Sequence, residues 1–111
     1  MATDADIARL IHDLDESSGG VADEAEYSLI ALGQEVVGPL IAAIPSLGHG
    51  KVFAINVLEA AGDRRAGPVL IDLLGDKDDV VRHYAARTLA TLGIKNAVSA
   101  LQHAYEETKG R

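Results

Sequence analysis

The stretch "DDVVRHYAARTLATLG", residues 78–93, has the pattern of one amphipathic helix with a marked start and a marked end. Its apolar residues recur three and four positions apart, the spacing that places side chains on one helix face. Asp78 or Asp79 can cap the helix by accepting a bond from a free backbone N–H. Gly93 ends it, because glycine readily adopts the left-handed conformation common at helix C-termini.

The same pattern occurs three times in the chain. Gly33, Gly62 and Gly93 each close a helical pattern and lie 29 and 31 residues apart. Apolar residues recur at fixed distances from these glycines: Leu29, Leu58 and Leu89 four before, Ala25, Ala54 and Ala85 eight before, and Ile41, Leu70 and Leu101 eight after. Self-similarity at a fixed period predicts a repeat array.

Each repeat is predicted to be a helix pair, since a second apolar stripe follows each glycine. Pairs of this kind must stack to cover their apolar faces, and the recurring alanines let neighbouring helices approach closely. We therefore expect an all-α, right-handed α-solenoid of seven helices in one domain, residues 1–111. Its parts are an N-terminal helix over 4–16, capped by Asp4, and repeats over 21–47, 50–75 and 78–108.

Composition favours the same fold and a cytoplasmic protein. Apolar residues make up 48% of the chain but aromatic residues only 4%, so the core must consist of aliphatic side chains. Cysteine is absent, which excludes thiol chemistry and disulfides. The apolar stretch over residues 36–47 is interrupted by Gly38, Pro39 and Pro45 and is too short to span a bilayer. We expect no membrane association.

Negative charge is concentrated in the first half of the chain. Residues 1–50 contain nine acids and one base, Arg9, whereas residues 51–111 contain eight acids and nine bases. The resulting net charge of −8 in the first half opposes binding to a phosphate backbone, so no nucleic-acid partner is expected.

Residues 61–107 closely resemble the short HEAT-like repeats found in phycobilisome lyases. The shared features are Gly62-Asp63 at the turn within a repeat, Pro68 and Leu70 in the second helix, and an acidic turn before Val81-Arg82. Lys51 occupies the Arg82 position in the preceding repeat. The resemblance implies an α-solenoid that serves as a protein-binding scaffold, and it raises a bilin-lyase-like chaperone subunit as an alternative.

Residues that carry enzyme or metal chemistry are scarce. The four histidines form no HExxH motif and no His-Glu dipeptide, which separates the chain from HEAT-like di-iron hydroxylases. We expect no enzymatic activity, no metal and no cofactor. Tyr27, Tyr84 and Tyr105 are expected to pack at helix interfaces, and Arg82 to bind acids or carbonyls between repeats.

The predicted binding surface is formed by the second helices, with Ile71 as an apolar anchor that has no evident core role. Its two rows are Ala42, Ile71 and Gln102, and Ala43, Asp72 and His103. The acids expected to attract a basic partner protein are Asp13, Asp15, Glu16, Asp23, Glu24 and Glu26. A small immunity protein that inhibits a basic toxin is another interpretation of this acidity.

Overall fold

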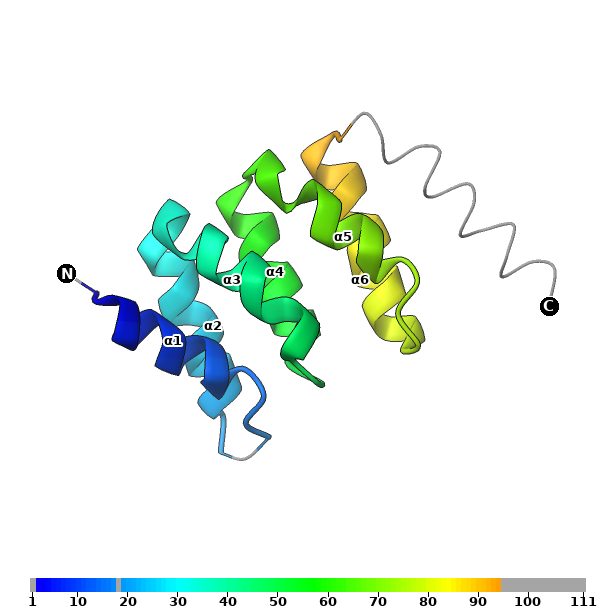
Figure 1. Cartoon of the computed structure of the whole chain (residues 1–111). Helices are drawn as coiled ribbons and strands as arrows, with labels where there is room; N and C mark the ends of the chain where they lie inside the picture. Colours follow the sequence, from blue (N-terminus) through cyan, green and yellow to red (C-terminus); the bar gives the residue numbers. More distant parts are fainter. Residues whose placement is uncertain (1, 18, 95–111) are drawn as a thin grey trace, which may run out of the picture.

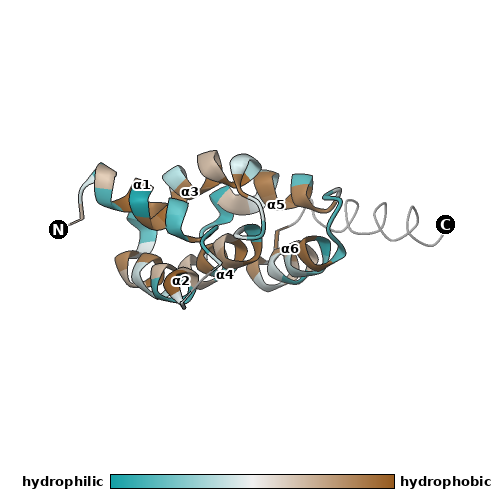
Figure 2. Ribbon diagram, turned by 90° about the horizontal axis from the view of Figure 1, so that it is seen from below, coloured by the Kyte–Doolittle hydropathy of each residue, from teal (hydrophilic) through white to brown (hydrophobic). Residues whose placement is uncertain are grey.

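The computed structural model describes residues 2–17 and 19–94, which form a two-layered array of helices (Figure 1). One layer contains α1 (Asp4–Asp13), α3 (Val37–Ala43) and α5 (Gly67–Leu73). The other contains α2 (Val21–Leu32), α4 (Lys51–Ala61) and α6 (Asp79–Leu92), as the view from below shows (Figure 2). The described residues contain no strand, and the all-α, solenoid-like fold predicted from the repeat is confirmed.

The repeats lie side by side, with α4 between α2 and α6. Short 3₁₀ helices lie within the first two repeats, at Gly33–Val36 and Arg64–Ala66, and a third, Ile44–Ser46, follows α3. Pro39 and Pro68 lie in the first turns of α3 and α5, where a missing backbone N–H costs least. The seventh predicted helix, with Leu101 and Tyr105, lies outside the described residues, and the right-handed sense of the solenoid stays a prediction.

The start of α1 differs from the expectation. Thr3, rather than Asp4, is the N-cap: its side chain accepts a bond from the N–H of Asp6, 3.1 Å away. The Asp6 carboxylate in turn accepts a bond from the N–H of Thr3, which completes a capping box. These bonds from the backbone and side chain of Thr3 lower the pKa of Asp6. Asp4 is then the first helical residue, and its negative charge interacts favourably with the positive N-terminal end of the helix dipole.

The three glycines that define the repeat have positive φ. Gly62 and Gly93 end α4 and α6 in the left-handed region, with φ of 66° and 63°. Gly33 follows α2 with φ 70° and ψ −136°, a conformation outside that region, and the chain turns there into the other layer. Residues with a Cβ rarely adopt such φ values, which explains why glycine recurs.

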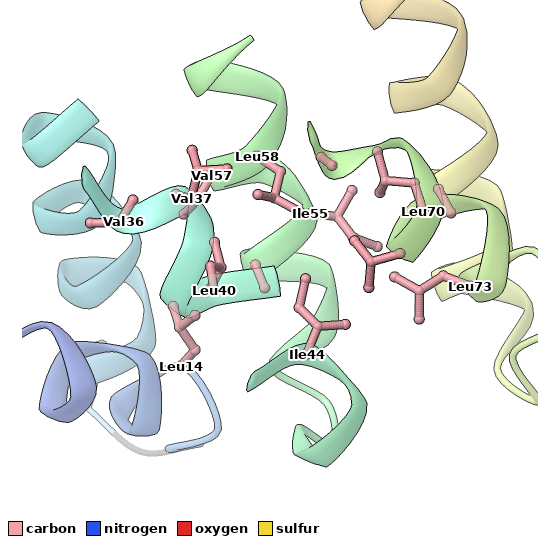
Figure 3. Close-up of a cluster of buried hydrophobic side chains, with 14 of the residues drawn as sticks. Leu14, Val36, Val37, Leu40, Ile44, Ile55, Val57, Leu58, Leu70 and Leu73 are labelled. Carbon is pink, nitrogen blue, oxygen red and sulfur yellow. The ribbon is translucent and has the colours of Figure 1, made fainter. Parts of the chain in front are cut away.

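The core is continuous across all repeats and is aliphatic (Figure 3). The recurring alanines Ala25, Ala54 and Ala85 are buried, with exposed fractions of 2%, 0% and 0%. The recurring leucines are completely buried in α2, α4 and α6: Leu29, Leu58 and Leu89. The equivalent buried sites of the three alanines, predicted from the glycine spacing, are therefore confirmed.

Replacing Leu58 by Asp should unfold the domain near room temperature. An unpaired carboxylate at this site would lose its hydration without a partner, at a cost of several kcal/mol, which is comparable with the total stability of a domain this size. Thermal unfolding followed by circular dichroism measures the effect. Ala60→Asp is the matched control, because Ala60 is exposed on the same helix. Equal melting temperatures for wild type and Leu58→Asp would contradict the assigned core.

Replacing Ala54 by Leu should destabilise the array by about 1–3 kcal/mol, because the added atoms must enter a filled interface. Ala60→Leu adds the same atoms at an exposed site of α4 and should change stability by less than about 0.5 kcal/mol. Urea unfolding of the two variants checks this. Similar losses for both would show that helix spacing does not depend on the alanine.

Candidate protein-binding surface

The layer of second helices exposes only part of the predicted binding rows. Ala42 in α3 and Asp72 in α5 are exposed, whereas Ala43 and Ile71 are half-buried and pack against the core. Ile71 follows the fully buried Leu70 by one residue, so it lies at the flank of the buried face of α5. The prediction that Ile71 has no core role is wrong. Gln102 and His103 lie outside the described residues.

Asp15 has a structural role that the charge pattern did not indicate. Its carboxylate accepts bonds from the N–H groups of Gly48, at 3.1 Å, and Gly50, at 2.8 Å. A Cβ at Gly50 would lie 2.5 Å from the same carboxylate and 2.6 Å from the carbonyl oxygen of Leu14. The turn at residues 48–50 therefore wraps closely around the Asp15 carboxylate, which fixes the turn while keeping its negative charge.

The other acids predicted to attract a partner differ in exposure. Asp23 and Glu24 are exposed on α2, and Glu26 is half-buried. Asp13 is half-buried, with its Oδ1 4.0 Å from Nδ1 of His12, and Glu16 is exposed. The strongest accessible negative charge of this set therefore lies at the start of α2.

A second polar link joins the loops between repeats. Lys51 Nζ lies 2.8 Å from Asp76 Oδ2, and both side chains are largely buried. Asp76 Oδ1 also accepts a bond from the N–H of Asp78, and the Asp76 carbonyl accepts one from Arg82. Lys51, at the position equivalent to Arg82, therefore makes a different contact: it binds the carboxylate of the following turn, whereas Arg82 binds the carbonyl of the preceding turn. The expected link from Arg82 to an inter-repeat carbonyl is confirmed.

The opposite edge of the array carries a repeated contact that bridges neighbouring repeats. The side chain of Gln34 donates to the carbonyl of Ala61 at 2.7 Å, and Arg64 donates to the carbonyl of Gly93 at 2.8 Å. Both acceptors lie at the C-terminus of the next first helix, where carbonyls lack helical partners. Each turn within a repeat therefore caps the helix of the following repeat.

Polar side chains also cross between α4 and α6. Arg87 donates to Asn56 at 3.3 Å and to Glu59 at 3.4 Å, and its guanidinium lies 4.5 Å from the centre of the Tyr84 ring. The buried Thr88 hydroxyl donates to Glu59 at 3.3 Å. These groups satisfy one another, so this face contributes to stacking more than to ligand binding.

Two large apolar side chains are exposed on α2, and sequence reasoning missed both. Tyr27 is 77% exposed and Ile30 is 40% exposed. The expectation that Tyr27 packs at a helix interface is therefore wrong, whereas Tyr84 does pack against the core. The repeat itself could have predicted this exposure. The positions equivalent to Tyr27, six residues before Gly62 and Gly93, are occupied by the polar residues Asn56 and Arg87.

The recesses on the described surface include the following two. One of about 260 Å³ lies between the start of α2 and α4 and is lined by Glu16, Asp23, His49 and Phe53, among others. The other, of about 430 Å³, lies between the loops and contains Lys51, Lys77, Asp76 and Asp78. The described residues include no group of three or more potential metal-ligating side chains.

One segment has the composition of a membrane-crossing helix. Val21–Ser46 is 26 residues long, and an 18-residue window within it has a mean hydropathy of 1.5. In the fold these residues are divided at Gly33 between α2 in one layer and α3 in the other, and their buried apolar faces pack into the common core.

The stability contributed by the Lys51–Asp76 ion pair depends on pH, because Asp76 can be protonated. Burial raises the pKa of Asp76, but bonds from Lys51 and from the N–H of Asp78, with the charges of Lys51 and Lys77, lower it below its ordinary value of 3.8. The folded chain then binds this proton less readily than the unfolded chain. The contact therefore stabilises the fold above the ordinary pKa, and the stabilisation is lost as pH falls through the lowered pKa.

Asp76→Asn should cost about 1–3 kcal/mol at neutral pH, because the ammonium group of Lys51 loses its charged partner in a largely buried site. The difference from wild type should shrink once pH falls below the ordinary pKa of 3.8. Urea unfolding across this pH range measures it, with Asp72→Asn as the control at an exposed carboxylate. A difference independent of pH would exclude the Asp76 charge as its cause.

Comparison with known proteins agrees with this geometry. A family model of HEAT repeats matches residues 49–111, more than half of the chain. No curated protein and no solved structure shows significant similarity to the chain. HEAT repeats generally mediate protein–protein interaction, and the family is typically non-enzymatic. The matched residues include α4, α5 and α6, whose stacking the structure shows, and the chain belongs to the HEAT-repeat family.

Proposed function

We propose that this chain is a non-enzymatic, cytoplasmic protein-interaction module that binds a basic partner protein. The observation that carries the proposal is the stacked array of HEAT repeats, an architecture that generally mediates protein–protein interaction. The charge of the first half supports a basic partner over a nucleic acid, since nine of its residues are acids and one is a base.

The exposed acids act through long-range attraction. Asp23 and Glu24 on α2 lie at the surface, where charges chiefly raise association rates and are screened by salt. Asp15 keeps its negative charge, but its carboxylate also has a structural role, since it accepts bonds from the N–H groups of Gly48 and Gly50. The layer of second helices contributes Ala42 and Asp72 as small and polar surface groups.

Inhibition of a basic toxin is the second candidate function. The same negative charge favours it, because an acidic module could cover the basic active face of a nuclease-like enzyme. The two candidates differ in the consequence of binding: an inhibitor abolishes the partner's activity at equal molar amounts, whereas a scaffold leaves that activity intact.

The proposal is tested by capture of partners with the tagged full chain, followed by binding measurements on each purified candidate. We expect saturable binding whose association rate falls about tenfold or more between about 50 mM and 500 mM salt, with a smaller change in dissociation rate. Asp23→Asn combined with Glu24→Gln should slow association at low salt. Absence of saturable binding to any purified protein would contradict the proposed function, and a salt-independent rate would contradict the role of the acids.

A further inference from the structure

The exposed face of α2 carries a stripe of three side chains that no described element covers. Asp23, Tyr27 and Ile30 are spaced four and three residues apart, so they follow one side of the helix. Tyr27 is 77% exposed and Ile30 is 40% exposed, and a third exposed apolar residue, Val80, lies on α6. Asp23 is thus the acidic end of an otherwise apolar stripe.

The recess of about 260 Å³ adjoins the acidic end of this stripe. Asp23 and Glu16 supply carboxylates to its lining, while Ala22 and Phe53 supply apolar surface and an aromatic ring. The volume is below the range of about 300–1,000 Å³ typical of small-molecule sites. The recess therefore suits one side chain of a partner better than a separate small ligand.

The chemistry of the lining favours a cation with a planar head. Carboxylates accept its hydrogen bonds, and an aromatic ring attracts it by a cation–π interaction. The cation nearest in sequence to this part of α4, Lys51, is paired with Asp76 at 2.8 Å. A guanidinium fits both the ring and the carboxylates better than a compact ammonium group, because it is planar and donates in a fixed fork.

We propose that the recess and the stripe form one docking site for an arginine-bearing segment of a basic partner protein. The arginine enters the recess beside Asp23 and Phe53, and an apolar residue of the same segment packs on Tyr27 and Ile30. This assignment rests on the proposed function and moves the apolar anchor from Ile71, which packs against the core, to α2.

Helix geometry sets the spacing of the two partner residues. Asp23 and Ile30 are seven residues apart, which corresponds to about 10 Å along α2. An extended peptide covers that distance in about three residues. The segment therefore carries its apolar residue about three positions from the arginine.

The test uses the peptide Leu-Gly-Ser-Arg-Gly-Ser-Leu, with blocked ends, which presents leucine at this spacing in either chain direction. Titration into the ¹⁵N-labelled full chain should shift the amide signals of Ala22, Asp23, Tyr27 and Phe53. Replacing the arginine by citrulline keeps the shape and removes the charge. The citrulline peptide should bind at least about tenfold more weakly, the effect of losing a charge-assisted hydrogen bond.

Variants of the chain separate the two halves of the site. Asp23→Asn should weaken binding of the arginine peptide about tenfold or more and leave binding of the citrulline peptide unchanged. Tyr27→Ala should weaken both peptides to a similar degree, because it removes apolar contact. Asp79→Asn and Val80→Ala are matched controls at an exposed acid and an exposed apolar residue of α6, outside both proposed binding surfaces.

Equal binding of the arginine and citrulline peptides, or equal losses in Asp23→Asn and Asp79→Asn, would overturn the docking site. Binding of the captured natural partner to the same variants shows whether only the docking site on α2 is wrong or the proposed protein-binding function as well. A partner that binds Asp23→Asn and Tyr27→Ala as tightly as wild type, but binds Ala42→Arg weakly, would place the contact on the layer of second helices. Absence of any protein partner would instead reject the function itself.

Discussion

The close approach of α2, α4 and α6 depends on a methyl-sized side chain at one repeated position. Ala25, Ala54 and Ala85 are buried in the common core, together with the fully buried leucines four residues later. A single helix pair leaves one apolar face uncovered, so each repeat gains stability only when the next repeat lies against it. Stability and helix spacing are therefore properties of the stack.

Polar contacts at the two edges add a defined register to this apolar stacking. On one edge, Asp15 holds the turn at Gly48 and Gly50, and Lys51 is paired with Asp76. On the other edge, Gln34 and Arg64 each cap the first helix of the following repeat. Aliphatic surfaces can slide over one another at small cost, whereas these directional bonds lose their geometry on sliding. The edges thus determine how successive repeats are aligned.

The stack also decides which groups remain available to a partner. Asn56 on α4 accepts a bond from Arg87 of the next repeat, while the equivalent residue on α2 is the exposed Tyr27. The first repeat therefore differs from the others in its outer face, although its buried face is the same. It also carries much of the negative charge, which brings an apolar stripe and carboxylates together on α2.

The sequence by itself determined the described helices of the repeats and the equivalent positions of the buried alanines and leucines. These features follow from helical periodicity and from the glycine that ends each first helix, and both act within about ten residues of the chain. Only the tertiary structure decided the roles of Asp15, Tyr27 and Ile71. Asp15 contacts a turn more than thirty residues away, Ile71 lies at the flank of a face covered by other helices, and Tyr27 has no covering helix. Such roles depend on which distant segment lies alongside, and a local pattern carries no information about that segment.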